Sequence, residues 1–142
     1  MRVQPYEQAH LPALLDLVNL HLAAVVPGWA IPGHFLAEHL ERNTGEHITD
    51  PWVVERATLC VTEGHRMLAA AHLLRYGEGP DAGKNLRGVG ELSWHVSLPE
   101  RDVAASEMLS RAHETFDVWP AARLQAYGAG LPKVPLLGIP DT

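Results

Sequence analysis

The stretch from Val89 to Trp119 constrains the fold more than any other part of the sequence. It begins with a largely apolar run typical of a buried strand, passes through a tight turn after Pro99, and continues as an amphipathic pattern from Asp102. Helical spacing places five apolar residues on one face of that pattern: Ala105, Met108, Leu109, Ala112 and Phe116. A strand, a turn and a helix in this order direct free backbone N–H groups at a bound anion. The stretch therefore predicts a layered fold with a candidate anion site at the start of the helix.

The rest of the chain continues with elements of the same two kinds. In order, we expect a strand (2–7), a helix (11–26), a shorter helix after Pro32, a hairpin (58–76), the strand and helix described above, and a strand (123–127). Gly64 suits the first central position of a type II′ hairpin turn. The second arm of the hairpin is almost continuously apolar, which indicates a strand covered on both faces. The order β-α-α-β-β-β-α-β predicts an α/β domain with a mixed, mainly antiparallel sheet flanked by helices.

Length and composition limit the class of protein. The 142 residues, 46% hydrophobic and 20% charged, are expected to form one domain with one core. A net charge of −6 without blocks of like charge argues against a nucleic-acid-binding surface, which needs a basic stripe. Prolines and glycines interrupt the uncharged run over residues 17–37, so no membrane-spanning helix is expected. A single cysteine, Cys60, and the lack of an apolar leader indicate a cytoplasmic protein.

Three other patterns have simpler explanations than the chemistry they suggest. His34, Glu38 and His39 resemble a zinc helix, but histidines five residues apart diverge around a helix, so no metal site is expected. Cys60 lies within an expected strand and is interpreted as a buried, unreactive thiol. The glycine-rich segment 77–88 lacks the spacing of a phosphate-binding P-loop and is interpreted as a loop.

The element order, with Pro99 and Arg101 between strand and helix, resembles the GNAT superfamily of acyl-CoA N-acyltransferases. The resemblance covers residues 1–127 as a GNAT-like domain and is sharpest in ELSWHVSLPERDVAASEML, residues 91–109. It implies that backbone N–H groups at the helix start bind the pyrophosphate of acetyl-CoA. It also implies that the end of the preceding strand binds the pantetheine arm and the acyl carbonyl. The implied activity is transfer of an acetyl group from acetyl-CoA to a small-molecule or peptide amine.

The resemblance also implies roles for individual residues. Glu91 would deprotonate the amine through water, and Tyr127 would protonate the leaving thiolate. The strand-end residues beside the acyl group would be Trp94, His95 and Val96, and the cofactor-binding residues of the helix start would be Arg101, Asp102, Val103, Ala104, Ala105 and Ser106. Without the resemblance, residues of these types more often have structural roles, such as a hydrogen-bonded strand carboxylate and a solvated arginine.

The helix start departs from the pattern of the family. Ala104 stands where the first glycine belongs and Ser106 where a glycine or alanine belongs, and a Cβ at position 104 is expected to keep phosphate away from the backbone. Glu100 and Asp102 place two carboxylates beside the same site, and Asp102 makes a good N-cap without any ligand. We therefore expect a degenerate motif with weakened affinity for acetyl-CoA.

The end of the sequence is a second departure. Family members continue with a helix and two strands, whereas residues 128–142 form a proline- and glycine-rich tail. The chain thus resembles the degenerate N-terminal domain of a tandem-GNAT protein, truncated after the fifth strand. An open sheet edge favours pairing, so a homodimer or a second GNAT domain is the expected partner. The alternative functions are a non-catalytic dimerisation or regulatory scaffold, and a small-ligand module that holds something other than coenzyme A between the fourth and fifth strands.

Overall fold

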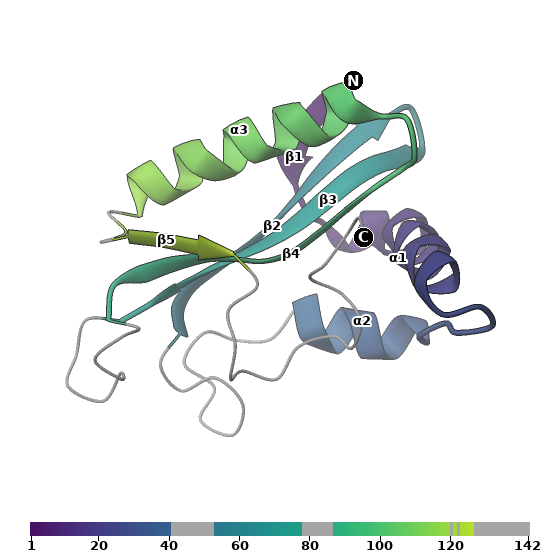
Figure 1. The fold of residues 1–142 in the computed structure, drawn as a ribbon, viewed down its shortest axis with the longest axis horizontal. Coiled ribbons are helices and arrows are strands. Elements are labelled where there is room, and N and C mark those ends of the chain that lie inside the picture. The colour runs from purple at the N-terminus through teal and green to yellow at the C-terminus, as the bar shows by residue number, and fades with distance from the viewer. Residues whose placement is uncertain (41–52, 78–86, 120, 122, 127–142) are drawn as a thin grey trace.

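The computed structural model describes residues 1–40, 53–77, 87–119, 121 and 123–126 (Figure 1). The elements are β1 (Arg2–Pro5), a 3-10 helix η1 (Gln8–His10), α1 (Leu11–Val25), α2 (Gly33–Leu40), β2 (Val53–Glu63), β3 (Arg66–Tyr76), β4 (Val89–Ser97), α3 (Asp102–Val118) and β5 (Arg123–Ala126). This order confirms the prediction and adds one short 3-10 turn. The expected truncation after the fifth strand and the tail 128–142 lie outside the described residues.

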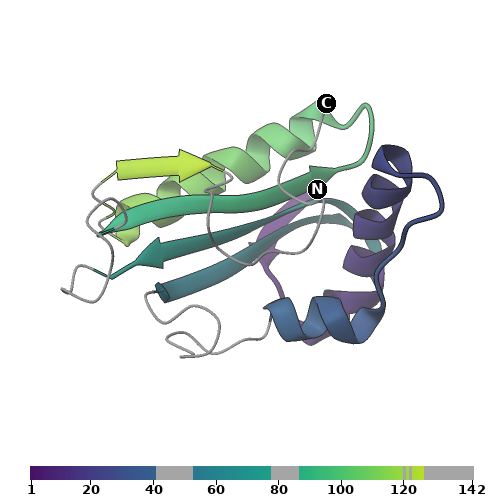
Figure 2. The same ribbon diagram turned by 60° about the horizontal axis from the view of Figure 1, so that its bottom comes forward.

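The five strands form one sheet in the order β1-β2-β3-β4-β5. The first three pairings are antiparallel, and β4 and β5 run parallel. Helix α3 lies along one face of the sheet, and α1 and α2 lie on the other (Figures 1 and 2). The fold is therefore a three-layer arrangement with a central mixed sheet, as the sequence predicts.

The hairpin between β2 and β3 has the turn that the sequence predicts. Glu63 pairs with Arg66, which leaves Gly64 and His65 as a two-residue loop. Gly64 has a φ of 62°, and Glu100 is the only non-glycine residue with positive φ in the described part of the chain. Positive φ at the first central position but not the second is the requirement of a type II′ turn.

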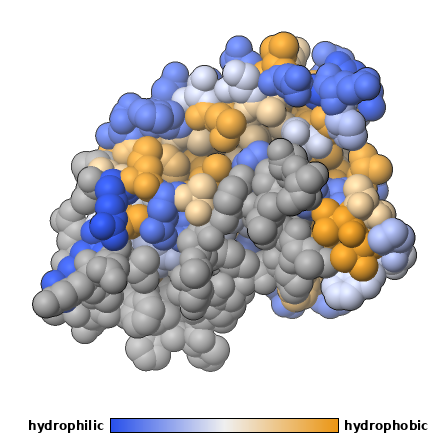
Figure 3. Space-filling model, in the orientation of Figure 1, coloured by the Kyte–Doolittle hydropathy of each residue, from blue (hydrophilic) through white to orange (hydrophobic). Residues whose placement is uncertain are grey.

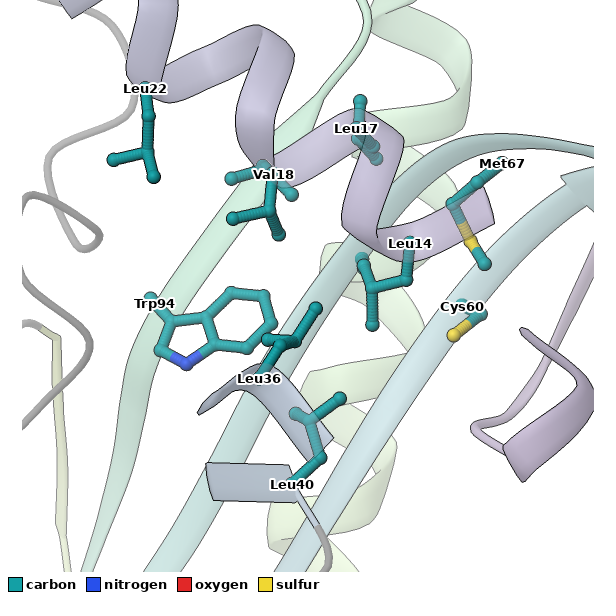
Figure 4. Packing of buried hydrophobic residues seen from close by; sticks show 11 residues of the cluster. Leu14, Leu17, Val18, Leu22, Leu36, Leu40, Cys60, Met67 and Trp94 are labelled. Atoms are coloured by element: carbon teal, nitrogen blue, oxygen red, sulfur yellow. The ribbon is translucent and has the colours of Figure 1, made fainter. Parts of the chain in front are cut away.

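The sheet divides the apolar interior into two main clusters. The cluster under α1 and α2 is shown in Figure 4 and consists of Leu14, Leu17, Val18, Leu22, Leu36, Leu40, Cys60, Met67, Ala70, Trp94 and Val96. The cluster under α3 consists of Leu59, Val61, Leu68, Ala69, Ala71, Leu73, Ala104, Met108, Ala112 and Phe116. Strand β3 contributes to both, which explains its almost continuous apolar sequence.

The inward face of α3 differs from the predicted face. Ala104 is buried with Met108, Ala112 and Phe116, whereas Ala105 is only partly buried and Leu109 is 40% exposed. The prediction of Ala105 and Leu109 as inward residues was therefore wrong. Positions 104, 108, 112 and 116 follow a strict four-residue spacing, while the prediction spread the face over the neighbouring apolar positions. Ala104 therefore lies on the side of α3 that faces the sheet, and this position affects the candidate anion site at the helix start.

Candidate functional site

The candidate site lies where β4 separates from β5. The parallel pairing runs from Val89 opposite Arg123 to Leu92 opposite Ala126, and β4 continues beyond it to Ser97. Figure 1 shows β4 extending well past the described part of β5 towards the start of α3. Among the described residues, the side of β4 that faces β5 thus has no strand partner after Leu92. Backbone groups of an unpaired strand edge can hydrogen-bond an extended ligand.

A β-bulge marks the same point of β4. The pairing with β3 shifts between His72 and Leu73, which lie opposite Trp94 and Leu92, so that Ser93 is the extra residue. Leu92 packs against the α3 cluster, whereas Trp94 belongs to the cluster under α1 and α2. In a regular strand, residues two positions apart have their side chains on the same face of the sheet. The bulge at Ser93 therefore moves the side chains that follow it to the opposite faces.

Glu91 is completely buried, with 0% of its surface exposed. Gln125 of β5 donates from Nε2 to Glu91 Oε1 at 2.8 Å, and the Tyr76 hydroxyl donates to the same oxygen over a longer 3.4 Å. Because Gly90 and Leu92 face α3, Glu91 faces the opposite side, and the bulge places Trp94 on that side as well. The carboxylate thus lies in the part of β4 that pairs with β5, two residues before the bulge.

The three strand-end residues have different surroundings. Trp94 and Val96 are both completely buried under α1 and α2, whereas His95 is partly buried. Trp94 donates from its indole Nε1 to His39 Nε2 at 2.9 Å. The side chains of Trp94 and Val96 therefore pack in the core, so these two residues can offer an acyl group only their backbone.

The turn between β4 and α3 ends with an unusual backbone conformation. Glu100 has a φ of 63°, and Arg101 N–H donates to the Leu98 carbonyl at 3.3 Å. Arg101 occupies the N-cap position, and no side chain caps the helix in the described structure. The predicted N-cap, Asp102, is instead the first helical residue and is exposed. The prediction was displaced by one residue, and the carboxylate still complements the helix dipole.

The first turn of α3 leaves backbone N–H groups for an anion, although its side chains fall on different faces. Val103 and Ser106 are exposed, Ala105 is partly buried, and Ala104 is only 2% exposed. Since Ala104 packs with the sheet cluster, its Cβ points towards the core. The expected steric block of phosphate by this Cβ is therefore wrong. The carboxylates of Glu100 and Asp102 remain exposed beside the helix start.

Three solved structures have a fold similar to that of this chain. The chain superposes on a probable acetyltransferase with a TM-score of 0.65 and 19% identity, covering 88% of this chain and 77% of that one. The aminoglycoside 6'-N-acetyltransferase AAC(6')-IG from Acinetobacter haemolyticus gives 0.59 and 16%, with 97% of both chains covered. AAC(6')-Iy, solved with a CoA bisubstrate analogue, gives 0.56 and 12%, covering 95% and 80%.

The fold is that of the GNAT acetyltransferases. No protein-family model matches the sequence, and no curated protein matches it either. Identities this low show a common GNAT fold and assign no role to an individual residue. The predicted resemblance and fold class are thereby confirmed.

The GNAT fold brings part of the predicted site together. Glu91 and Trp94–Val96 share β4, and residues 101–106 follow it directly across the turn. Tyr127 lies outside the described residues. Sequence reasoning missed Gln125 and Tyr76, which both donate to Glu91. No local pattern marks either residue, because both contacts come from strand pairing.

A shallow apolar hollow of about 400 Å³ adjoins the site on the α3 side of β5. Its lining includes Leu92, Leu109, Phe116 and Leu124. Figure 3 shows hydrophobic side chains at the surface over α3 and β5. Within the described ranges, no group of three or more metal-ligating side chains could hold a metal ion. In the same ranges, no helix is long and apolar enough to cross a membrane.

Proposed function

We propose that the protein is a GNAT-type N-acetyltransferase that transfers an acetyl group from acetyl-CoA to an amine. The separation of β4 from β5 after Leu92, directly before the start of α3, carries the proposal. An extended pantetheine arm would bind the unpaired edge of β4, and the pyrophosphate would meet the N–H groups of the first turn of α3. Acetyl-CoA is thus a substrate held almost entirely by backbone groups.

Glu91 is the proposed general base. The amine nitrogen bonds to the thioester carbonyl carbon, the carbon–sulfur bond breaks, and the amine proton passes through water to Glu91. The coenzyme A thiolate takes a proton from Tyr127, the role that the resemblance implies, and the products are an amide and free coenzyme A. Gln125 keeps the carboxylate oriented by its 2.8 Å hydrogen bond. Backbone groups beside the bulge at Ser93 would stabilise the oxyanion.

Weak affinity for acetyl-CoA is part of the proposal, and electrostatic repulsion is its cause. Glu100 and Asp102 are exposed at the helix start, while Arg101 is the basic residue between them. A carboxylate a few ångströms from a phosphate costs about 1 kcal/mol at a partly hydrated site. Two of them would lower the affinity about tenfold or more. The helix dipole and the free N–H groups act in the opposite direction.

Isothermal titration calorimetry with acetyl-CoA tests the proposal directly. We expect saturable binding with a dissociation constant below the millimolar range, and no heat at millimolar ligand would contradict it. Release of free thiol with a panel of amines then tests transfer. Aminoglycosides are the first acceptors to test, since two of the solved structures with this fold are aminoglycoside acetyltransferases by name. ATP, which lacks the pantetheine arm, is the control for general anion binding.

A non-catalytic GNAT-like scaffold is the second candidate. Complete burial of Glu91 and the two carboxylates at the helix start favour it, because both features oppose substrate access. Such a domain would dimerise or pair with a second, catalytic GNAT domain. Binding of a partner without binding of acetyl-CoA distinguishes this candidate. Cytoplasmic localisation belongs to both candidates and is supported by the sole cysteine, which is a buried free thiol.

A further inference from the structure

Three aromatic rings form a buried cluster between α2 and the sheet that the proposed reaction does not use. His39 belongs to α2, His72 to β3 and Trp94 to β4. The His72 and Trp94 rings are stacked, with centroids 5.7 Å apart and an interplanar angle of 13°. The His39 ring lies 5.0 Å from His72 and 6.1 Å from Trp94. His39 is 7% exposed, and the other two rings are fully buried.

The hydrogen bonds of His72 fix the position of its proton. Arg56 Nη1 lies 3.1 Å from His72 Nε2, and Thr58 Oγ1 lies 2.8 Å from His72 Nδ1. A guanidinium group can only donate, so His72 Nε2 must accept. The imidazole proton is then on Nδ1 and is donated to the Thr58 hydroxyl. His72 is therefore a neutral imidazole in this arrangement.

The same argument applies to His39. The indole N–H of Trp94 can only donate, and its acceptor is His39 Nε2 at 2.9 Å. His39 Nε2 must therefore carry a lone pair, and its proton is on Nδ1. This bond links the last turn of α2 directly to β4. Its strand partner, Trp94, lies one residue after the bulge at Ser93.

We propose that the bond between His39 and Trp94 is a pH-sensitive latch that holds the last turn of α2 on β4. Protonation of His39 Nε2 removes the lone pair that accepts this hydrogen bond. The buried indole N–H of Trp94 then loses His39 as its acceptor. A solvent-exposed histidine takes up a proton near pH 6.5, so mildly acidic conditions favour the open latch over the closed one. The inference concerns α2 and the sheet and does not depend on acetyl transfer.

The groups around His39 disfavour a cationic imidazole in the closed latch, so protonation favours the open one. Charged or titratable groups near the ring cluster include Arg56 on β2, His72 on β3, and Glu91 and His95 on β4. Helix α1, which packs against α2, carries Asp16 and His21. Arg56 is cationic and is bonded to His72, the ring next to His39. A second positive charge at His39 is repelled by it. Asp16 is exposed, and Glu91 accepts from Gln125.

The indole N–H resonance of Trp94 in a proton–nitrogen NMR spectrum reports the latch. We expect it to shift between pH 8 and pH 5 in the unmodified protein, following one titration. In His39→Gln the shift should disappear, because a glutamine amide oxygen can occupy the place of Nε2 and accept at any pH. Trp94→Phe assigns the resonance by its loss; contacts between the indole proton and the His39 ring assign it if that variant does not fold.

Stability measurements provide a second, independent readout. Between pH 8 and pH 5, the folding equilibrium constant of the unmodified protein should fall about fivefold relative to that of His39→Gln, the loss expected for one buried hydrogen bond. The other histidines are common to both proteins and cancel in the comparison. An indole resonance that does not move, or that titrates identically in His39→Gln, would overturn the proposal.

Discussion

At the scale of single residues, the environment of a side chain decides its chemistry more than its identity does. Glu91 is recognisable in the sequence only through the resemblance to a family. In the structure it is a buried carboxylate oriented by Gln125, 34 positions away in the sequence. Burial and orientation of this kind are typical of a general base and also of a structural acid. Substitution of Glu91 distinguishes a general base from a structural acid.

Glu91→Gln tests the base. We expect acetyl transfer to fall about a hundredfold or more, because a positioned general base contributes about 10²–10⁴ to the rate. Acetyl-CoA binding, measured by calorimetry, should stay within about twofold, since the side chain lies away from the start of α3. Gln125→Leu is the matched positioning variant and should lower the rate by a smaller factor and change its pH profile. A variant Glu91→Gln with undiminished turnover would exclude Glu91 as the base.

Cys60 should be inert in the folded protein. Burial raises the pKa of its thiol from 9.0 to about 12, and the thiolate is the reactive form. We expect no reaction with a disulfide reagent at pH 8, and one equivalent of reaction in guanidinium chloride. Rapid labelling of the native protein would show that the core opens locally.

The same pKa shift predicts how stability depends on pH. Above pH 9 the unfolded thiol loses its proton, while the folded thiol keeps it up to about pH 12. The contribution of this group to stability is therefore complete below pH 9. It is lost as pH rises from 9 to 12, by up to about 1.4 kcal/mol per pH unit. In denaturant unfolding, the free energy of unfolding of Cys60→Ala should lack this decrease between pH 9 and pH 12.

Glu100 is expected to lower both the stability of the fold and the affinity for acetyl-CoA, and two substitutions distinguish these effects. Its φ of 63° favours glycine, and its carboxylate opposes an anion at the helix start. Glu100→Gly should stabilise the fold by up to about 1 kcal/mol and also tighten acetyl-CoA binding. Glu100→Gln should tighten binding to a similar extent without the gain in stability. Equal binding by all three proteins would show that no phosphate is bound beside residue 100.

At the scale of elements, β4 and α3 show what a sequence pattern can and cannot specify. The pattern predicted both elements and their order, because apolar periodicity is a local property. It did not predict the bulge at Ser93 or the inward position of Ala104. Both depend on where neighbouring strands hold the backbone. Alternating apolar residues fit a continuous strand as well as a bulged one.

The contact between β4 and α3 gives a sharp test of this packing. A Cβ added at Gly90 would lie 2.7 Å from Phe116 Cδ1 and 3.0 Å from the Cβ of Ala121. Gly90→Ala should therefore destabilise the protein by about 1–3 kcal/mol in denaturant unfolding. Gly33→Ala is the control: its Cβ would meet Leu15 Cδ2 at an ordinary 3.4 Å, so it should be neutral or stabilising. Similar stabilities for both variants would contradict the packing of Phe116 on Gly90.

At the scale of the whole molecule, association can have two causes. The proposed homodimer would be specific, whereas a molecule near zero net charge also associates non-specifically. The net charge of −6 at pH 7 approaches zero near the isoelectric point of about 5.8. Sedimentation velocity at pH 8 over a hundredfold concentration range separates the two. We expect a dimer at pH 8 that persists at high salt, and a monomer throughout would contradict the homodimer.

The sequence by itself determined the order of elements, the two-faced character of β3, the type of the 64–65 turn and the fold class. These features follow from local periodicity and from the conformational preferences of turn residues, which do not depend on contacts with distant segments. Only the tertiary structure decided that Ala104 faces the core, that Gln125 and Tyr76 donate to Glu91, and that His39 accepts from Trp94. Each of these depends on strand register or helix rotation. Such features are fixed by packing between residues distant in sequence, and no single segment encodes them.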